Sequence, residues 1–258
     1  MIGKKREFTP QIIIFSCNWG SFAGTDFSEI GGFKFPKSVR VVKVMCANKA
    51  DPMIILEMLR EGADGVMLLG CHPGDCRYQI SNNETMGNIE LIEKLLDLTG
   101  LERKRVSLGW VSSDEEAKFG ELISDFVERV KKMGPNRAVK DGGLNERLAA
   151  AVDAASSPRS RGCVSKKREL VESGNIYSET FTERQFDLVL DPIIAQEYKR
   201  ARVALLTKDG ARVRDVANAL GIEDSEVMIH ITALRQKGKI VLDRIEDDGN
   251  PIFRSVVA

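Results

Sequence analysis

The first half of the chain alternates short apolar runs with amphipathic segments. The apolar runs cover residues 12–15, 39–45, 66–69 and 106–111, and their length and composition are typical of buried β-strands. Strands that alternate with helices form a parallel sheet covered on both faces, because each crossover helix packs back onto the sheet. We therefore expect residues 8–134 to form an α/β domain with a small flavodoxin-like or Rossmann-like parallel sheet.

The helices between these runs are bounded by capping residues and glycines. Asp51 is placed to cap the first helix, Pro52 suits its first position, and Gly62 ends it. The same signals predict two further helices, one from Gly87 or Asn88 to Gly100 and one from Ser112 or Ser113 to Gly134. The crossovers after the second and third strands are therefore expected to be helical.

The second half of the chain is predicted to contain a connector and a second domain. Residues 135–190 are interrupted by Gly, Pro and Ser, so we expect a partly helical connector with helices over 144–155 and 166–173. Residues 191–258 show three helical patterns and then two strands around an Asp-Asp-Gly-Asn-Pro turn, at 193–206, 213–220, 225–237, 240–245 and 252–257. That order is typical of a winged helix-turn-helix domain.

Four cysteines follow the first three predicted strands. Cys17 and Cys46 end the first two apolar runs, and Cys71 and Cys76 flank a Pro-Gly turn after the third. Because the carboxyl ends of parallel strands meet at one edge of a sheet, these thiols are expected to converge. Four thiolates are the ligand set of one iron–sulfur cluster or one structural zinc ion. The pattern therefore predicts a metal or redox centre at this edge.

Other interpretations of the cysteines are open at the level of residue types. Each could be a small buried hydrophobe, although three successive strands ending in Cys are improbable by chance. The Cys71–Cys76 spacing matches part of a plant-type [2Fe–2S] pattern, whereas structural zinc sites more often use closer pairs, so iron–sulfur is favoured over zinc. His72 is either a ligand, a hydrogen-bond donor to the site, or an exposed loop residue. Cys163, in the polar connector, is expected to have no role.

Composition excludes several classes of function. The 258 residues carry 38 Lys and Arg against 38 Asp and Glu, and residues 191–258 carry eleven of each sign, which disfavours DNA binding. No apolar run approaches the roughly 20 residues of a membrane span. Five cysteines at low density are typical of a reducing compartment, so we expect a cytoplasmic protein. Two histidines and the lack of a nucleotide-binding loop predict a non-catalytic protein.

Several strings resemble the delta subunit family of methyl-viologen-reducing hydrogenase over residues 8–134. They are Phe-Ser-Cys-Asn-Trp at 15–19, Val-Met-Cys at 44–46, Glu-Gly-Ala-Asp-Gly-Val at 61–66 and Gly-Cys-His-Pro-Gly-Asp-Cys at 70–76. The resemblance implies a [2Fe–2S] electron-transfer subunit. Its partners would be a hydrogenase or other dehydrogenase and the flavin-bearing subunit of a heterodisulfide-reductase-type complex.

Carried over to this chain, the resemblance makes Cys17, Cys46, Cys71 and Cys76 the expected cluster ligands. The chain departs from the family pattern at two positions, where Gly20 and Ser16 stand in place of family cysteines. Two rival hypotheses stay open. One is a transcription regulator that senses redox state through its cluster and binds DNA through the winged helix, and the other is a zinc-stabilised docking subunit.

Overall fold

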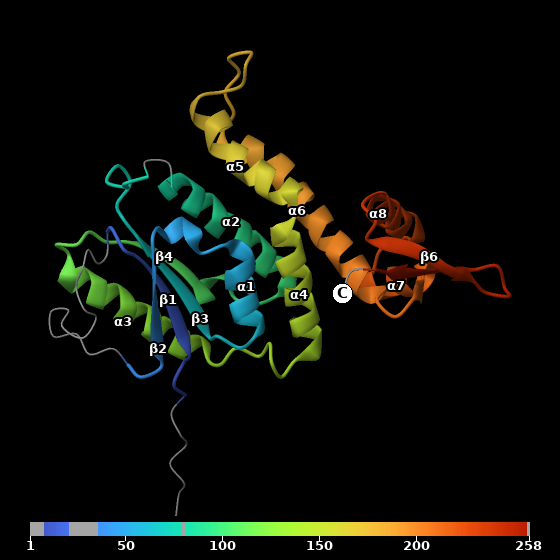
Figure 1. The fold of residues 1–258 in the computed structure, drawn as a ribbon, viewed down its shortest axis with the longest axis horizontal. Coiled ribbons are helices and arrows are strands. Elements are labelled where there is room, and N and C mark those ends of the chain that lie inside the picture. Colours follow the sequence, from blue (N-terminus) through green and yellow to red (C-terminus); the bar gives the residue numbers. More distant parts are fainter. Residues whose placement is uncertain (1–7, 21–35, 79–80, 257–258) are drawn as a thin grey trace, which may run out of the picture.

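The central element of the fold is a four-stranded parallel sheet. The computed structural model describes residues 8–20, 36–78 and 81–256. The strands are β1 (Ile12–Cys17), β2 (Val39–Val44), β3 (Gly65–Gly70) and β4 (Val106–Trp110), arranged in the order β2-β1-β3-β4 (Figure 1). The parallel α/β sheet predicted from the apolar runs is confirmed.

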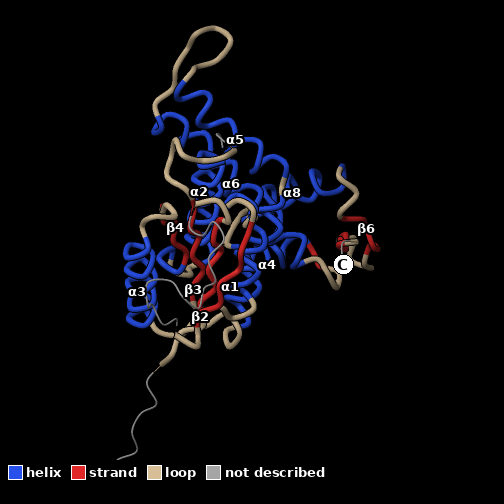
Figure 2. The backbone as a smooth tube through the Cα atoms, turned by 60° about the vertical axis from the view of Figure 1, so that its left-hand side comes forward, coloured by secondary structure: helices blue, strands red, loops and turns tan. Residues whose placement is uncertain are grey.

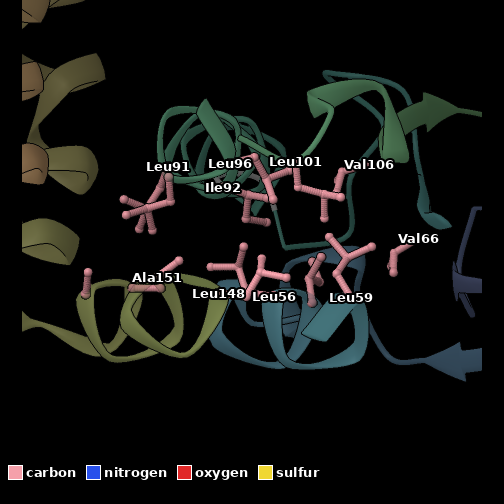
Figure 3. Close-up of a cluster of buried hydrophobic side chains, with 14 of the residues drawn as sticks. Leu56, Leu59, Val66, Leu91, Ile92, Leu96, Leu101, Val106, Leu148 and Ala151 are labelled. Carbon is pink, nitrogen blue, oxygen red and sulfur yellow. The ribbon is translucent and has the colours of Figure 1, made fainter. Parts of the chain in front are cut away.

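Helices cover both faces of this sheet. One face is covered by α1 (Pro52–Arg60) and α2 (Ser81–Thr99), on which α4 (Gly142–Ser156) packs in turn, and Figure 3 shows Leu56, Leu96 and Leu148 meeting between these helices. The other face packs against α3 (Glu116–Met133) through Phe119 and Phe126. The fully buried strand β3 serves both cores because successive side chains point to opposite faces.

The helix boundaries agree with the sequence at α1 and differ at α2 and α3. Asp51 caps α1 by accepting a hydrogen bond from the Met53 amide at 2.9 Å, as predicted. Helix α2 begins at Ser81 rather than at Gly87 or Asn88. The polar residues Ser81, Asn82 and Thr85 in its first turns are buried by tertiary packing, which an apolar pattern cannot predict. Helix α3 begins after Glu115 rather than after Ser112 or Ser113, since residues 112–115 form a turn closed by the Ser112 amide and the Glu115 carboxylate.

Beyond α3, the chain forms three helices, α4, α5 and α6. Helix α4 packs its Leu and Ala side chains into the core shared with α1 and α2, and α5 (Pro158–Glu172) then lies against α6 (Glu183–Leu206). Helix α6 begins well before the predicted residue 193. Thr182 and Gln185 form a reciprocal capping box at its start, and Pro192 is accommodated inside the helix.

Two short 3₁₀ helices, η1 (Ala47–Lys49) and η2 (Arg103–Arg105), lie in the loops of the parallel-sheet domain.

The C-terminal elements form a separate small core. They are β5 (Ala211–Arg212), α7 (Val213–Leu220), α8 (Asp224–Gln236), β6 (Ile240–Ile245) and β7 (Pro251–Ser255), with an antiparallel sheet in the order β5-β7-β6. Val216, Ile231 and Phe253 meet in this core. Helix α8 begins one residue before Ser225, the predicted cap, and Glu223 occupies the capping position. Across the described residues, none of the helices has the length and apolar character of a membrane span.

Candidate metal centre

Four buried thiols lie at the carboxyl ends of the first three strands. Cys17 ends β1, Cys46 follows β2, and Cys71 and Cys76 lie in the loop after β3. Cys17, Cys71 and Cys76 form one contact cluster, in which the Sγ atoms of Cys17 and Cys71 are 3.6 Å apart. None of the cysteines, all of which lie in the described residues, takes part in a disulfide. The predicted convergence of thiols therefore holds in the structure for these three side chains.

Cys46 lies beside this cluster without joining its contacts. Its side chain is buried, and it interacts electrostatically with Cys17 and Cys76. The fifth cysteine, Cys163, lies on α5 and packs against the core of α1, α2 and α4 instead. The structure thus separates the four predicted ligands from the cysteine that was expected to have no role.

The separation of Cys17 and Cys71 can be compared with metal geometry. Two thiolates bound at about 2.3 Å to one tetrahedral metal atom are about 3.8 Å apart, close to the observed separation. Within the described ranges, no three His, Cys, Asp or Glu side chains are already arranged around a point where a metal ion could sit. The four cysteines therefore fit a thiolate-bound group in residue type, and Cys17 and Cys71 also fit it in their sulfur–sulfur distance. Cys46 and Cys76 would have to turn their side chains toward the bound group.

The protonation of Cys71 and Cys46 is influenced by burial and by the neighbouring cysteines. Burial, the neighbouring charges of Cys17 and Cys76 and the hydrogen bond with Cys17 raise the pKa of Cys71 to about 12. Burial also raises the pKa of Cys46, against the lowering effect of hydrogen bonds from Asn48 and Ser81. Burial therefore favours the protonated form of Cys71 and Cys46, whereas a bound metal cation would favour their thiolates.

Two residues hold Cys71 in place, and sequence reasoning missed one of them. The buried Asn82 side chain donates a 2.6 Å hydrogen bond from Nδ2 to the Cys71 carbonyl. Gly20 lies so close that a Cβ atom there would be 2.8 Å from Cys71 Sγ. Asn82 lies in the polar stretch 81–85, which shows no periodic pattern of apolar residues, so nothing in the sequence marked Asn82 as a residue of the site. Gly20 was identified in the sequence only as a departure from the family pattern.

The His72 ring contacts the start of α3. Its Nε2 atom lies 2.6 Å from Glu115 Oε2, and Lys118 Nζ donates to Glu115 Oε1 at 3.1 Å. Hydrogen bonds from the Ser112 amide, His72 and Lys118 lower the pKa of Glu115 to about 2. These contacts tie the loop that carries Cys71 and Cys76 to α3. The His72 side chain is 31 % exposed and is paired with Glu115.

Partly exposed apolar side chains flank the cysteines along the chain. Trp19 is 38 % exposed and lies under the Arg77 guanidinium, which is 4.0 Å from the ring centroid. Met45 and Tyr78 are 52 % and 43 % exposed. Ser16, the other departure from the family pattern, is buried, and its hydroxyl finds no hydrogen-bond partner among the described residues. Strand alternation places Ser16 on the face opposite Cys17, the face that packs against α3.

Comparison with known proteins gives a match over the sheet and its cysteines. Residues 12–134 match the family described as "Methyl-viologen-reducing hydrogenase, delta subunit". The iron-sulfur subunit of the F420-non-reducing hydrogenase vhc from Methanococcus voltae is 39 % identical over 129 residues, which are 50 % of this chain and 90 % of that protein. The chain belongs to the methyl-viologen-reducing hydrogenase delta subunit family.

Two further relatives of this delta subunit family show where similar sequences occur. An iron-sulfur subunit of the F420-non-reducing hydrogenase from Archaeoglobus profundus is 38 % identical, over 50 % of this chain and 94 % of that protein. One subunit of the ferredoxin/F(420)H(2)-dependent CoB-CoM heterodisulfide reductase from Methanosarcina acetivorans is 32 % identical, over 49 % of this chain and 16 % of that protein. The family match ends where α3 ends, so α4 to α8 lie outside it.

Proposed function

We propose that this protein is an electron-transfer subunit of an oxidoreductase complex and that it carries a [2Fe–2S] cluster on Cys17, Cys46, Cys71 and Cys76. The observation that carries the proposal is the contact cluster of three buried thiols, with the fourth beside it, inside the segment that matches the delta subunit family. When bound, the cluster would supply reversible one-electron chemistry. The relatives' names, which describe iron-sulfur subunits, support an iron–sulfur cofactor, and the [2Fe–2S] type is the finer part of the proposal.

The proposed partners are a hydrogenase or other dehydrogenase and the flavin-bearing subunit of a heterodisulfide-reductase-type complex. Sequences of this kind occur as a separate hydrogenase subunit in Methanococcus voltae and as part of a heterodisulfide reductase subunit in Methanosarcina acetivorans. One segment found in both contexts is suited to pass electrons from one enzyme to the other.

The residues around the thiols have roles that suit a relay. Asn82 and Gly20 fix the position of Cys71, and the Glu115 contact to His72 ties the loop to α3. Partly exposed Trp19 and Met45 lie within two residues of Cys17 and Cys46 in the chain, so the path from the thiols to the molecular surface is short. Such a surface allows a partner's redox centre to approach while burial keeps water from the sulfur atoms.

The C-terminal residues 191–258 are proposed to form a winged-helix-like domain that docks on protein rather than DNA. The order α6, α7, α8 and then the β6–β7 hairpin supports the winged-helix part. On α8, Met228 and Ile229 are exposed, and Glu226 pairs with Lys199 at 2.5 Å. An apolar surface and a neutralised lysine are poor phosphate contacts. The domain boundaries at residues 134/135 and 190/191 stay predictions. The cytoplasmic location of the protein also stays a prediction.

The proposal is tested by following electrons through the protein as isolated. Full-length protein, purified without oxygen, is mixed with reduced methyl viologen, and its visible absorption is recorded before and after addition of oxidised flavin. We expect bleaching by the viologen and recovery with the flavin, in the wild type and in Cys163→Ala but not in Cys17→Ala. A colourless protein that takes up no electrons would contradict the relay. Salt-sensitive binding to duplex DNA would instead support the regulator.

A further inference from the structure

The contact between Trp19 and Arg77 joins the two segments that carry Cys17 and Cys76. Strands β1 and β3 are neighbours in the parallel sheet, whose strands are drawn in red in Figure 2, so the segments that follow them leave the same edge. Trp19 lies two residues after Cys17, and Arg77 directly follows Cys76. The Arg77 guanidinium carbon is 4.0 Å from the centroid of the Trp19 ring. A cation over an aromatic face is attracted by the ring electrons, so this contact stabilises the approach of the two segments.

The same two segments also meet at the thiols. Cys17 and Cys76 belong to one contact cluster and are only 2 % and 7 % exposed. The Trp19 side chain is 38 % exposed, and Arg77 is exposed as well. The junction between the segments therefore has a buried part, formed by the thiols, and a solvent-facing part, formed by the cation–π contact.

The two ends of the loop after β3 are held in different ways. Its beginning is fixed by hydrogen bonds that involve Asn82 and Glu115. At its end, no hydrogen bond between described residues holds residues 76 and 77. The stacking of the guanidinium on the Trp19 ring is therefore the directional contact that restrains this end of the loop.

The charge of Arg77 is not neutralised by an ion pair within the described part of the chain. Lys118, another basic side chain near the loop, pairs with Glu115 at 3.1 Å, whereas no carboxylate of the described residues pairs with Arg77. Because reduction of a bound cluster adds one negative charge, a positive charge beside it stabilises the reduced form. The Trp19 ring thus holds a positive charge one residue away from a proposed ligand.

We propose that Trp19 and Arg77 form a clasp that keeps Cys76 in the thiol cluster and holds a positive charge beside it. Arg77 is thereby a positioning residue, since it acts through Cys76 and through its charge without being a ligand. The effect of the charge rests on the proposed function, because it requires a bound cluster. The effect on Cys76 requires only the folded chain, so the two effects are tested separately.

The position of Cys76 is tested by labelling metal-free, full-length protein with iodoacetamide in the absence of oxygen. Tandem mass spectrometry gives the labelling rate at Cys76, and Cys163 in the same sample is the reference. Arg77→Gln and Trp19→Leu are each expected to speed labelling of Cys76 about three- to fivefold, as loss of an exposed cation–π contact implies. Trp19→Phe keeps an aromatic face and should stay within about twofold of wild type. Unchanged labelling in Arg77→Gln and Trp19→Leu, or equal rates in Trp19→Phe and Trp19→Leu, would overturn the proposal.

A double variant and a matched control show whether the pair acts as a unit. In Arg77→Gln/Trp19→Leu, labelling should be no faster than in the faster single variant, because one contact can be lost only once. Single effects that multiply would reveal two independent changes and would overturn the clasp. The control is Arg129→Gln, since the Arg129 guanidinium carbon lies 5.0 Å from the Phe126 ring centroid on α3. Labelling of Cys76 should there equal wild type, and the same acceleration as in Arg77→Gln would overturn the assignment.

The charge is tested by redox titration of the iron-loaded protein with dithionite. We expect a more negative midpoint potential in Arg77→Gln than in wild type, and a potential closer to wild type in Arg77→Lys, which keeps the charge. Equal potentials in Arg77→Gln and wild type would overturn the role of the charge. A chain that binds no iron would instead contradict the proposed function, and labelling of Cys76 would still decide the clasp.

Discussion

Gly20 and Cys71 approach each other so closely that a Cβ atom at position 20 would lie 2.9 Å from Cys71 Cα and 2.8 Å from Cys71 Sγ. A cysteine here, which the resemblance would lead one to expect, therefore requires movement of the Cys71 backbone. The absence of a side chain at position 20 is thus part of the geometry that brings Cys71 against Cys17. In this chain the position of Cys71 in the thiol cluster depends on the glycine at position 20.

The first prediction is that Gly20→Ala lowers the amount of bound iron. Forcing a methyl group against the Cys71 backbone displaces it from Cys17, and overpacking of this kind costs about 1–3 kcal/mol. Iron and sulfide per chain, measured after anaerobic purification, check it. Gly162→Ala is the matched control, because a Cβ there meets no atom within 4 Å and the residue lies inside α5. Equal iron content in the two variants would show that the close approach is unimportant.

The second prediction concerns the contact between Glu115 and His72. Glu115→Gln removes the charge that binds His72 and Lys118, so the loop carrying Cys71 and Cys76 is held less firmly. We expect iron to be lost to a chelator several-fold faster than in wild type at neutral pH. The control is Glu128→Gln, also on α3, whose carboxylate is largely exposed and pairs only with nearby Lys131 in the described structure. Identical rates for the two variants would count against a role for the contact.

The stabilisation that the Glu115 contacts give to the folded protein should also depend on pH. The pKa of Glu115 is lowered from 4.5 to about 2 by its hydrogen bonds, so the unfolded chain binds a proton more readily than the folded one. The stabilisation is therefore present above about pH 4.5 and is lost as the pH falls toward about 2. Urea unfolding of the metal-free protein should show the difference between wild type and Glu115→Gln shrinking over that interval.

A third prediction arises from His230, which is 2 % exposed on α8. Burial and the charges of Arg200 and Lys199 on α6 lower its pKa below 6.5, against the opposing effect of Glu226, whose carboxylate is 3.7 Å away. Because only the unfolded chain takes up this proton near pH 6.5, the free energy of unfolding should fall as the pH drops from about 7 to about 5.

The variant His230→Leu isolates this effect. It removes the titrating ring while keeping an apolar side chain in the core, so the unfolding free energy should vary less with pH than in wild type. Urea denaturation at several pH values measures the difference. The same pH dependence in the two proteins would contradict the assignment.

The sequence predicted the sheet and the meeting of Cys17 with Cys71, because both follow from apolar runs and from the geometry of parallel strands. Predictions from the sequence were wrong where tertiary contacts, rather than the local pattern of apolar and polar residues, decide where a helix begins. The start of α2 is polar and partly buried by packing, and the helix expected from residue 193 begins earlier, at the Thr182 capping box of α6. Long-range contacts such as Asn82 to Cys71 leave no periodic signal, so no analysis of spacing could have found them.

The measurement that tests the account most directly is metal and sulfide analysis of wild type, Cys71→Ala and Cys163→Ala, all purified without oxygen. The account predicts about two irons and two sulfides per chain in wild type and in Cys163→Ala, as a [2Fe–2S] cluster requires, and their loss in Cys71→Ala. Zinc in place of iron, no metal at all, or full iron content in Cys71→Ala would contradict the claim that these buried thiols hold an electron-transfer cluster.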